Sequence, residues 1–359
     1  MIYWELLALP CYIAVARSGI MPNQRDVARI AGVSSASVSR YLTSPHCVRP
    51  KTAQRIEHAI QETGYTLDHS ARSLRTGRSY HVGILMPGIG PFYWEIHQGI
   101  QDALIKAGYF NTIFYTRDTG GFHQIPPAEL LAKLSHKMME GVIFFPMDTK
   151  GDEVILREIQ RLHQNIVLVD RDMDNPTLDQ VFIDNHRAGR LAAQAFLDHG
   201  HRQLLFLDGM KTSYAAVQRR EGFLQYLAKK HIDFPPSRIL PGDYSALTAY
   251  KTAKKNIPTL PPFTGVFAVN DATAMGFLRA AGEEGLQCPH DFSLIGFDNN
   301  EEFTPFLTPS LSTFQQPLKD VGTIAAEHLL KQMDGLSPPK ITILQPQFIP
   351  RESLSTRLT

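Results

Sequence analysis

Residues 26–42 read DVARIAGVSSASVSRYL, and the spacing of their apolar side chains predicts two short helices joined by a tight turn. Gly32 supplies the turn, because a residue without a Cβ atom adopts the left-handed backbone conformation at little cost. Ser34 is placed to cap the second helix. This pattern is typical of a helix-turn-helix, which docks its second helix in the major groove of DNA. A structural αα-hairpin is the alternative interpretation.

The composition of the second helix favours DNA binding over a structural hairpin. Its short hydroxyl side chains can reach phosphate groups or base edges, and Arg40 can form a bidentate contact with guanine. The residues predicted from composition to contact DNA are Ser34, Ser35, Ser37, Ser39 and Arg40.

A third helix is predicted to follow, with Pro50 in its first turn and Gly64 at its end. A fourth helical stretch is predicted over residues 68–74, with Asp68 as its cap, and residues 76–79 form a polar linker. Together, residues 21–79 carry nine Lys and Arg side chains against four Asp and Glu, whereas residues 80–359 carry 26 against 30. A basic head on a mildly acidic body indicates a module that meets phosphate, although a solvated basic face would look similar.

After the linker, buried strand-like runs alternate with amphipathic helices, which is typical of parallel α/β sheets. The remaining 280 residues suffice for two doubly wound parallel sheets, and ligands in such folds bind beyond the carboxyl ends of the strands. The predicted strands include residues 81–86, 141–145, 166–169, 204–207, 265–269 and 293–297. The predicted helices include residues 94–107, 188–199, 215–230, 272–284 and 318–333.

Several other functions are disfavoured by the sequence. The three cysteines, Cys11, Cys47 and Cys288, form no metal-type spacing or disulfide framework. The glycine motif at residues 86–92 is incomplete as a dinucleotide fingerprint, because Tyr93 stands at the third glycine position. No Walker lysine motif, HExxH or GxSxG occurs, and His199 and His201 are interpreted as a helix end and turn. We therefore expect no enzyme, no cofactor and no metal site.

The chain resembles the lactose-repressor (LacI/GalR) family of bacterial transcription regulators. The resemblance covers residues 23–354 in the family's order. It is carried by DVARIAGVSSASVSRYL, VRPKTAQRIEHAIQETGY, ARSLRTG from Ala71, FIDNHRAGRLAAQAFLDHGHRQ from Phe182, RREGF from Arg219, SLIGFDN from Ser293 and FIPRESL from Phe348.

The resemblance implies roles for particular residues of the head. Ser35 and Ala36 would occupy the first exposed recognition positions, with Arg40 a helical turn onward. Leu74 would be the hinge leucine that wedges into the central minor groove and bends the duplex; packing within a short helix is its alternative role. The family usually has proline then asparagine before this helix, where this chain has Leu67 and Asp68.

The resemblance also implies a sugar-binding type of sensor, in which Arg219, Asn270 and Asp298 match polar ligand contacts. Aromatic residues at predicted loop positions, which suit the apolar face of a sugar ring, are placed at the same cleft, with a charged pair at its rim. Both a neutral sugar and an acidic or phosphorylated sugar fit this set. The effector-binding residues expected in addition are Phe92, Tyr93, Trp94, Tyr244, Asp170 and Arg171.

The sequence thus predicts a cytoplasmic homodimeric repressor of a carbohydrate operon, bound to a near-palindromic operator and controlled by a small sugar or sugar acid. A solute-binding protein without a DNA role and a sugar-modifying enzyme are the rivals. The expected domains are an extension or mis-assigned start (1–20), the helix-turn-helix (21–67), the hinge and linker (68–79) and the effector-binding and dimerisation domain (80–359). The last divides into lobe 1 (about 80–183 and 316–345) and lobe 2 (about 184–315 and 346–359).

Overall fold

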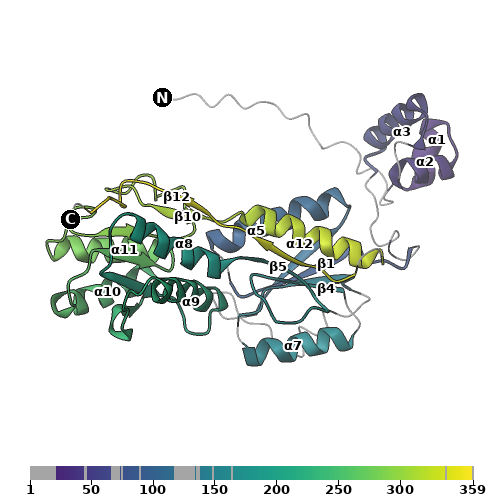
Figure 1. Cartoon of the computed structure of the whole chain (residues 1–359). Helices are drawn as coiled ribbons and strands as arrows, with labels where there is room; N and C mark the ends of the chain where they lie inside the picture. The colour runs from purple at the N-terminus through teal and green to yellow at the C-terminus, as the bar shows by residue number, and fades with distance from the viewer. Residues whose placement is uncertain are drawn as a thin grey trace, which may run out of the picture. The chain divides into compact units, whose positions relative to one another are not determined.

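The computed structural model divides the chain into two compact units, Met1–Arg78 and Ser79–Thr359 (Figure 1). It describes residues 22–43, 47–65, 73, 76–88, 90–116, 134, 138–147, 149–162, 165–335 and 338–357. The predicted extension of residues 1–20 lies outside these ranges, as does the predicted hinge helix of residues 68–74 except for Ser73.

Within the described ranges, the small unit contains three helices, α1 (Gln24–Ala31), α2 (Ser35–Thr43) and α3 (Pro50–Thr63). The predicted helix boundaries are confirmed: Gly32 ends α1 with a φ of 59°, and Gly64 ends α3 with a φ of 64°. A capping box that the sequence reading did not identify begins α1, where Asn23 accepts from the backbone N–H of Asp26 and the Asp26 carboxylate accepts from that of Asn23.

The small unit is held together by a buried apolar cluster from all three helices and the segment after α3. Burying one large apolar side chain contributes about 1.5–3 kcal/mol to the stability of the folded state. The cluster therefore holds α2 in place against the other two helices. Its buried members are Val27, Ala28, Ala31, Val38, Ile56, Ala59 and Tyr65.

In the described ranges, the first sheet of the larger unit is wholly parallel, with six strands in the order β11-β5-β4-β3-β1-β2. Helices α5 (Pro91–Lys106) and α12 (Leu318–Met333) cover one face, and α7 (Thr149–Arg161) covers the other. We call this sheet with its helices lobe 1. Its strands are β1 (His81–Met86), β2 (Phe110–Tyr115), β3 (Gly141–Phe144), β4 (Asn165–Val169), β5 (Asp179–Ile183) and β11 (Ile341–Leu344).

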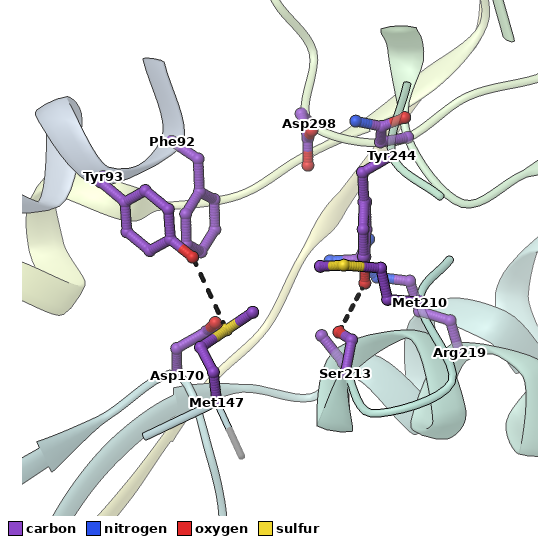
Figure 2. A pocket seen from close by; sticks show the side chains of 11 residues that line it. Phe92, Tyr93, Met147, Asp170, Met210, Ser213, Arg219, Tyr244 and Asp298 are labelled. Carbon is purple, nitrogen blue, oxygen red and sulfur yellow. Dashed lines mark hydrogen bonds between the residues drawn. The ribbon is translucent and has the colours of Figure 1, made fainter. Parts of the chain in front are cut away.

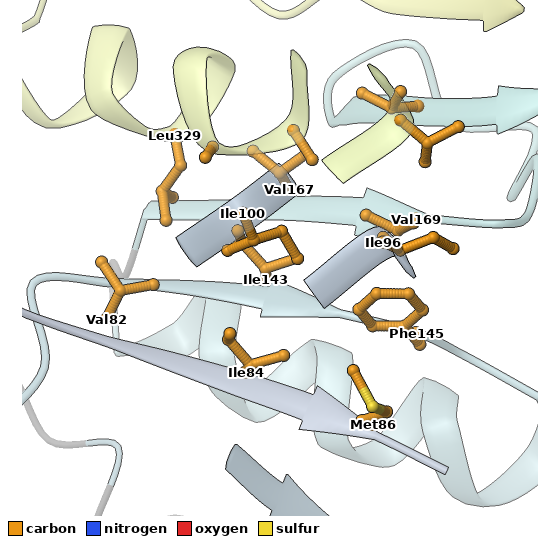
Figure 3. Packing of buried hydrophobic residues seen from close by; sticks show 14 of the residues in the cluster. Val82, Ile84, Met86, Ile96, Ile100, Ile143, Phe145, Val167, Val169 and Leu329 are labelled. Atoms are coloured by element: carbon orange, nitrogen blue, oxygen red, sulfur yellow. The ribbon is translucent and has the colours of Figure 1, made fainter. Parts of the chain in front are cut away.

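Alternate strand residues of lobe 1 fill two separate cores. Figure 3 shows the core under α5 and α12, where Ile84, Ile143 and Val167 of neighbouring strands meet Ile96 and Ile100 of α5. Residues one position along the strands face α7 instead, because side chains alternate between the two faces of a sheet. A sheet buried on both faces is the arrangement that parallel strands require.

The second sheet is also parallel, with the strand order β7-β6-β8-β9 among the described residues. Helices α8 (Asn185–Asp198) and α9 (Tyr214–Lys229) cover one face, and α10 (Ala246–Asn256) and α11 (Asp271–Glu283) cover the other. We call this sheet with its helices lobe 2. Its strands are β6 (Leu204–Asp208), β7 (Ile239–Pro241), β8 (Gly265–Ala268) and β9 (Ser293–Ile295), with 3₁₀ turns at Pro236–Arg238 and Ile257–Thr259.

The chain crosses between the lobes along three described segments: from β5 to α8, from β10 (Thr313–Gln315) to α12, and from β11 to β12 (Gln347–Ile349). Strands β10 and β12 form an antiparallel pair. The backbone N–H of Asp184 donates to the carbonyl of Leu344 at 2.9 Å, so the first and third crossings are hydrogen-bonded to each other.

Helices α8 and α9 approach each other at backbone contact. A Cβ atom on Gly189 would lie 1.9 Å from the carbonyl oxygen of Arg219, and one on Gly222 would lie 1.9 Å from that of His186. Only glycine fits at these positions, because real Cβ atoms do not approach backbone atoms this closely. The close packing fixes Arg219 relative to the first crossing between the lobes.

The predicted fold class is confirmed: a small helix-turn-helix head precedes an α/β region of two parallel sheets. One local prediction is wrong. Phe92 and Tyr93 were expected in a loop before a helix that starts at Trp94, but all three lie in the first turn of α5, which begins at Pro91. Proline is favoured at this position because its missing N–H would have no partner there and its φ angle already suits a helix.

Candidate functional site

Helix α2 presents the side chains that the sequence predicts to contact DNA. Val38 is fully buried against the other two helices, which turns the opposite face of α2 outward. Ser34, Ser35, Ala36 and Arg40 are exposed, and Ser37 and Ser39 are half-buried. The predicted recognition residues therefore share the accessible side of one helix. Leu74, the predicted hinge wedge, lies outside the described residues.

Ser34 has a structural role at the start of α2, which is the predicted cap. Its hydroxyl accepts from the backbone N–H of Ser37 at 3.1 Å and lies 2.9 Å from the Ser37 hydroxyl. The turn before it is held from α3, because the Arg55 guanidinium donates to the carbonyl of Gly32 at 3.1 Å. These contacts fix the first turn of α2, where recognition helices meet bases.

A cavity of about 260 Å³ lies between the two lobes of the larger unit (Figure 2). Six of its lining residues directly follow strands β3, β4, β6, β7, β8 and β9 or lie within a few residues of their ends, which is where ligands bind in doubly wound folds. The lining residues are Phe92, Tyr93, Met147, Asp170, Met210, Ser213, Ala215, Arg219, Tyr244, Asn270 and Asp298.

Seven of the nine effector-binding residues predicted from sequence thus line one cavity. One exception is Arg171, whose guanidinium carbon instead lies 5.8 Å from the centre of the Tyr214 ring. Arg171 directly follows Asp170, whose φ of 70° turns the backbone after β4, and only the Asp170 side chain lines the cavity. Trp94 is also outside the lining; it is 57% exposed and packs beside His97.

The sequence reading missed Met147, Met210, Ser213 and Ala215. Methionine, serine and alanine at these positions carry no chemical signal, and only their places after β3 and β6 could have indicated them. Ser213 caps α9 and its hydroxyl lies 2.7 Å from that of Tyr244, so it orients the ring that forms one wall. The Tyr93 hydroxyl donates to the Met147 sulfur at 3.7 Å on the other wall.

Arg219 is buried at the floor of the cavity, with 3% of its surface exposed. Its Nε–H donates to Asn185 Oδ1 at 2.8 Å and its Nη1–H donates to the carbonyl of Val269 at 2.7 Å. The guanidinium lies 3.5 Å from the centre of the Phe297 ring, a cation–π contact. Asn185 in turn donates to the carbonyl of Ile183 at 3.2 Å, so the cavity is connected to the first crossing between the lobes.

Carboxyl groups from both lobes enter the cavity and have raised pKa values. Burial raises the pKa of Asp170 to about 7, although Arg219 lowers it and Asp298 raises it further. Burial raises the pKa of Asp298 to about 6 against the lowering effects of Arg219 and of a 2.8 Å hydrogen bond from Gln316. Gln316 lies on the second crossing between the lobes, so this carboxylate also contacts a crossing segment.

Three cavity residues have unusual backbone conformations for residues with side chains. The φ angles of Asp170, Tyr244 and Asp298 are 70°, 58° and 112°. Such conformations cost on the order of 1–3 kcal/mol each and cluster at ligand sites, where the surrounding structure enforces them. The strain places two carboxylates and one aromatic ring at the cavity.

Within the described ranges, no group of His, Cys, Asp and Glu side chains is arranged to hold a metal ion. None of the helices in those ranges combines the length and apolar character that crossing a bilayer requires.

Comparisons with known proteins assign both units. The model for bacterial regulatory proteins of the lacI family matches residues 24–68, and the model for a periplasmic binding protein-like domain matches residues 193–354. The HTH-type transcriptional repressor PurR of Aliivibrio fischeri (strain MJ11) is 28% identical over 342 residues, which cover 94% of this chain and 100% of the relative.

Solved structures share the fold. A lac repressor dimer bound to operator and the anti-inducer ONPF matches with a TM-score of 0.78 and 22% identity, covering 92% of this chain and 98% of that one. A complex of the transcriptional regulator CelR with cellobiose matches with a TM-score of 0.69 and 23% identity, covering 92% and 99%. The chain thus carries a DNA-binding head that matches the lacI family of bacterial regulatory proteins, followed by a periplasmic binding protein-like domain, which is the organisation of a DNA-binding regulator.

Proposed function

We propose that this protein represses transcription by binding a near-palindromic operator as a homodimer, and that a small carbohydrate in the cavity between its lobes controls the operator affinity. The proposal rests on one observation: the same chain has both an exposed recognition face on α2 and a cavity lined by residues of both lobes. The relative from Aliivibrio fischeri is named a transcriptional repressor, and the lac repressor structure is a dimer on its operator.

The DNA half of the proposal rests on α2. Arg40 stands on the exposed side of the helix, a turn after the small side chains of Ser35 and Ala36. Small residues allow the helix to approach the bases closely, and a single arginine then supplies the bidentate contact to guanine that gives specificity. Leu74 is proposed as the hinge residue that inserts between bases and bends the operator.

The ligand half rests on the walls of the cavity. Figure 2 shows the rings of Phe92 and Tyr93 on one side and the ring of Tyr244 on the other. Aromatic faces suit the apolar side of a sugar ring, while Asp170, Asn270 and Asp298 offer polar partners to hydroxyl groups. The CelR structure that shares this fold holds cellobiose. The volume of about 260 Å³ lies just below the roughly 300–1,000 Å³ of drug-sized sites, which favours a small ligand.

A ligand bound between two lobes changes the angle between them, and in the proposed dimer this angle decides whether the two hinge helices form side by side. A ligand can shift that equilibrium only by the difference in its affinity for the two forms, typically about 1–3 kcal/mol.

Selection of bound sequences from random DNA by the full chain tests the proposal. We expect a near-palindromic consensus, and an operator affinity that changes when one member of a panel of common sugars is added. Sequence-independent binding alone, or no binding, would refute the repressor function. Chemical conversion of the added sugar during incubation, followed by NMR, would instead support a sugar-modifying enzyme.

A further inference from the structure

Acidic side chains outnumber basic ones around the cavity. Asp170 enters it from lobe 1 and Asp298 from lobe 2, while Arg219 is the one described lysine or arginine in its lining. Asp271, outside the lining, interacts electrostatically with Asp298, and its own pKa is raised to about 7 by burial and by Asp298. The described residues offer no hydrogen-bond donor to the Asp170 carboxylate, so a ligand in the cavity can supply one.

The acidic surplus extends outward from the cavity. Glu95 on α5 of lobe 1 interacts electrostatically with Glu301 of lobe 2, and burial together with Glu301 raises the pKa of Glu95. Glu95 also raises the pKa of Asp298. Carboxylates of the two lobes therefore face one another, and an anion entering between them would meet like charges in a medium that screens poorly.

Of the nearby arginines, Arg219 and Arg220 are already engaged within the protein, and Arg171 does not line the cavity. Arg219 uses its Nε–H and Nη1–H on Asn185 and the Val269 carbonyl, and its ring contact with Phe297 covers one face. Arg220 forms an ion pair with Asp208. Arg171, the second arginine expected at the rim, lies against Tyr214 outside the cavity lining, and its Nε and Nη1 are buried without a hydrogen-bond partner among the described residues. The paired guanidinium donors that bind a carboxylate or phosphate in fork geometry are therefore not directed at the cavity.

We infer that the ligand presents no negative charge to Asp170 and Asp298 and donates hydroxyl hydrogens to both carboxylates, so that the cavity selects neutral sugars over sugar acids and sugar phosphates. The inference rests on the proposed control by a carbohydrate and names its class. Each lobe contributes one of the two acceptors, so a single ring with hydroxyl groups on opposite edges bridges the lobes.

Because ligand binding changes the protonation of these carboxyl groups, the pH dependence of the sugar affinity has a predictable sign. Hydrogen bonds donated to a carboxylate favour its ionised form and lower its pKa. Since the pKa values of Asp170 and Asp298 are about 7 and about 6 before binding, a neutral sugar releases protons, and its affinity rises between pH 5.5 and 7.5. An anionic ligand would take up protons and bind more weakly as the pH rises. The charged or titratable groups that face this pair are Arg219, Asp271, Glu95 and Tyr244.

Calorimetry on the full chain with matched ligand pairs tests the selection. Suitable pairs are D-glucose with D-glucuronate, D-ribose with ribose 5-phosphate, and cellobiose with cellobionate, in two buffers of different ionisation enthalpy. We expect the neutral member of at least one pair to bind at least tenfold more tightly than its acid, with proton release. Tighter binding of the acid in every pair that binds, or proton uptake with the neutral sugar, would overturn the inference.

Two substitutions remove the charge of a cavity carboxylate while keeping the shape of its side chain. Asp298→Asn and Asp170→Asn keep the volume of the side chain but remove its charge. Each should therefore weaken binding of the neutral sugar about tenfold, and should reduce or reverse the preference for the neutral sugar over the matched acid. Asp174→Asn removes an exposed carboxylate outside the cavity lining and should leave both affinities unchanged. An unchanged preference in both cavity variants would contradict the inference.

A measurement without ligand covers the case in which no sugar of the panel binds. Carboxyl carbon NMR of the full chain, assigned with the two cavity variants, should show two aspartates that titrate well above the ordinary value near 4. Ordinary titration of both would overturn the inference, because the two carboxyl groups would then be hydrated or paired with a cation instead of buried near each other. Operator binding by the same samples reports on the repressor function separately.

Discussion

Arg40 stands on the exposed side of α2, where small neighbours leave it as the longest side chain of the predicted recognition set. We expect Arg40→Ala to weaken specific operator binding by about 1–3 kcal/mol and to leave salt-sensitive binding to random DNA largely intact. Anisotropy titrations with operator and random duplexes measure both. Arg29→Ala, which removes an exposed arginine from α1, is the matched control and should not alter the ratio of the two affinities. Equal losses on both duplexes in Arg40→Ala would show a phosphate contact instead.

Asp170 makes stability depend on pH. Its pKa is about 7 in the folded protein and about 3.9 in an unfolded chain, so between these values the folded state binds more protons. The free energy of unfolding therefore falls as the pH rises from 4 to 7. We expect the melting temperature to fall more steeply from pH 5 to pH 7.5 in the parent protein than in Asp170→Asn. Asp174→Asn should keep the parent slope; the same slope in Asp170→Asn would count against the raised pKa.

The cavity residues show what a sequence reveals at the residue scale. Asp170, Arg219 and Asp298 have distinctive chemistry and follow strands or belong to recognisable motifs, so they were predictable. Arg171 has similar chemistry, but its direction depends on the backbone turn at Asp170, and it contacts Tyr214 instead. Ser213 matters only because Tyr244, which is 31 residues away, reaches its hydroxyl, and no local pattern encodes that contact.

At the scale of elements, the turn between α1 and α2 depends on Gly32. Gly32 has a φ of 59°, and a Cβ atom there would lie 2.5 Å from Arg55 Nη2, so the guanidinium would have to move away from the Gly32 carbonyl to which it donates. Gly64 has a φ of 64° with open space around it. The left-handed conformation alone costs roughly 1–2 kcal/mol in a residue with a side chain. We expect Gly32→Ala to destabilise the head by more than Gly64→Ala and to weaken operator binding more, measured by chemical denaturation and anisotropy. Equal effects of the two substitutions would refute the proposed contact with Arg55.

The strands that were predicted and those that were missed differ in burial. Strands β1, β3 and β4 are continuous apolar runs in the middle of the sheet, and the sequence places each within one residue of its observed bounds. Edge strand β2 mixes exposed and half-buried positions, and β11 alternates between them, so neither resembles a buried strand. Strand β5 begins with buried Asp179, which is paired with His328 of α12 at 3.1 Å, and a charged residue obscures the strand pattern.

At the scale of the whole molecule, the two units have separate apolar cores, so the functions proposed for them should be separable. We expect residues 79–359 alone to dimerise and to bind the neutral sugar with the affinity of the full chain, but to lose operator binding. Ultracentrifugation, calorimetry and gel shift test the three parts. Full operator affinity without the head would contradict the assignment of DNA binding to α2.

The operator dissociation constant of the full chain, measured with and without saturating neutral sugar, shows whether the occupant of the cavity sets the affinity of the head for DNA. We expect the operator dissociation constant to change by roughly 5–150-fold. The sugar affinity should change by the same factor when operator is added, because coupling between two binding sites is reciprocal. Arg219→Ala should abolish this change, since it removes the contact between the cavity and the first crossing between the lobes. A sugar that saturates the cavity while the operator dissociation constant stays the same would contradict the account.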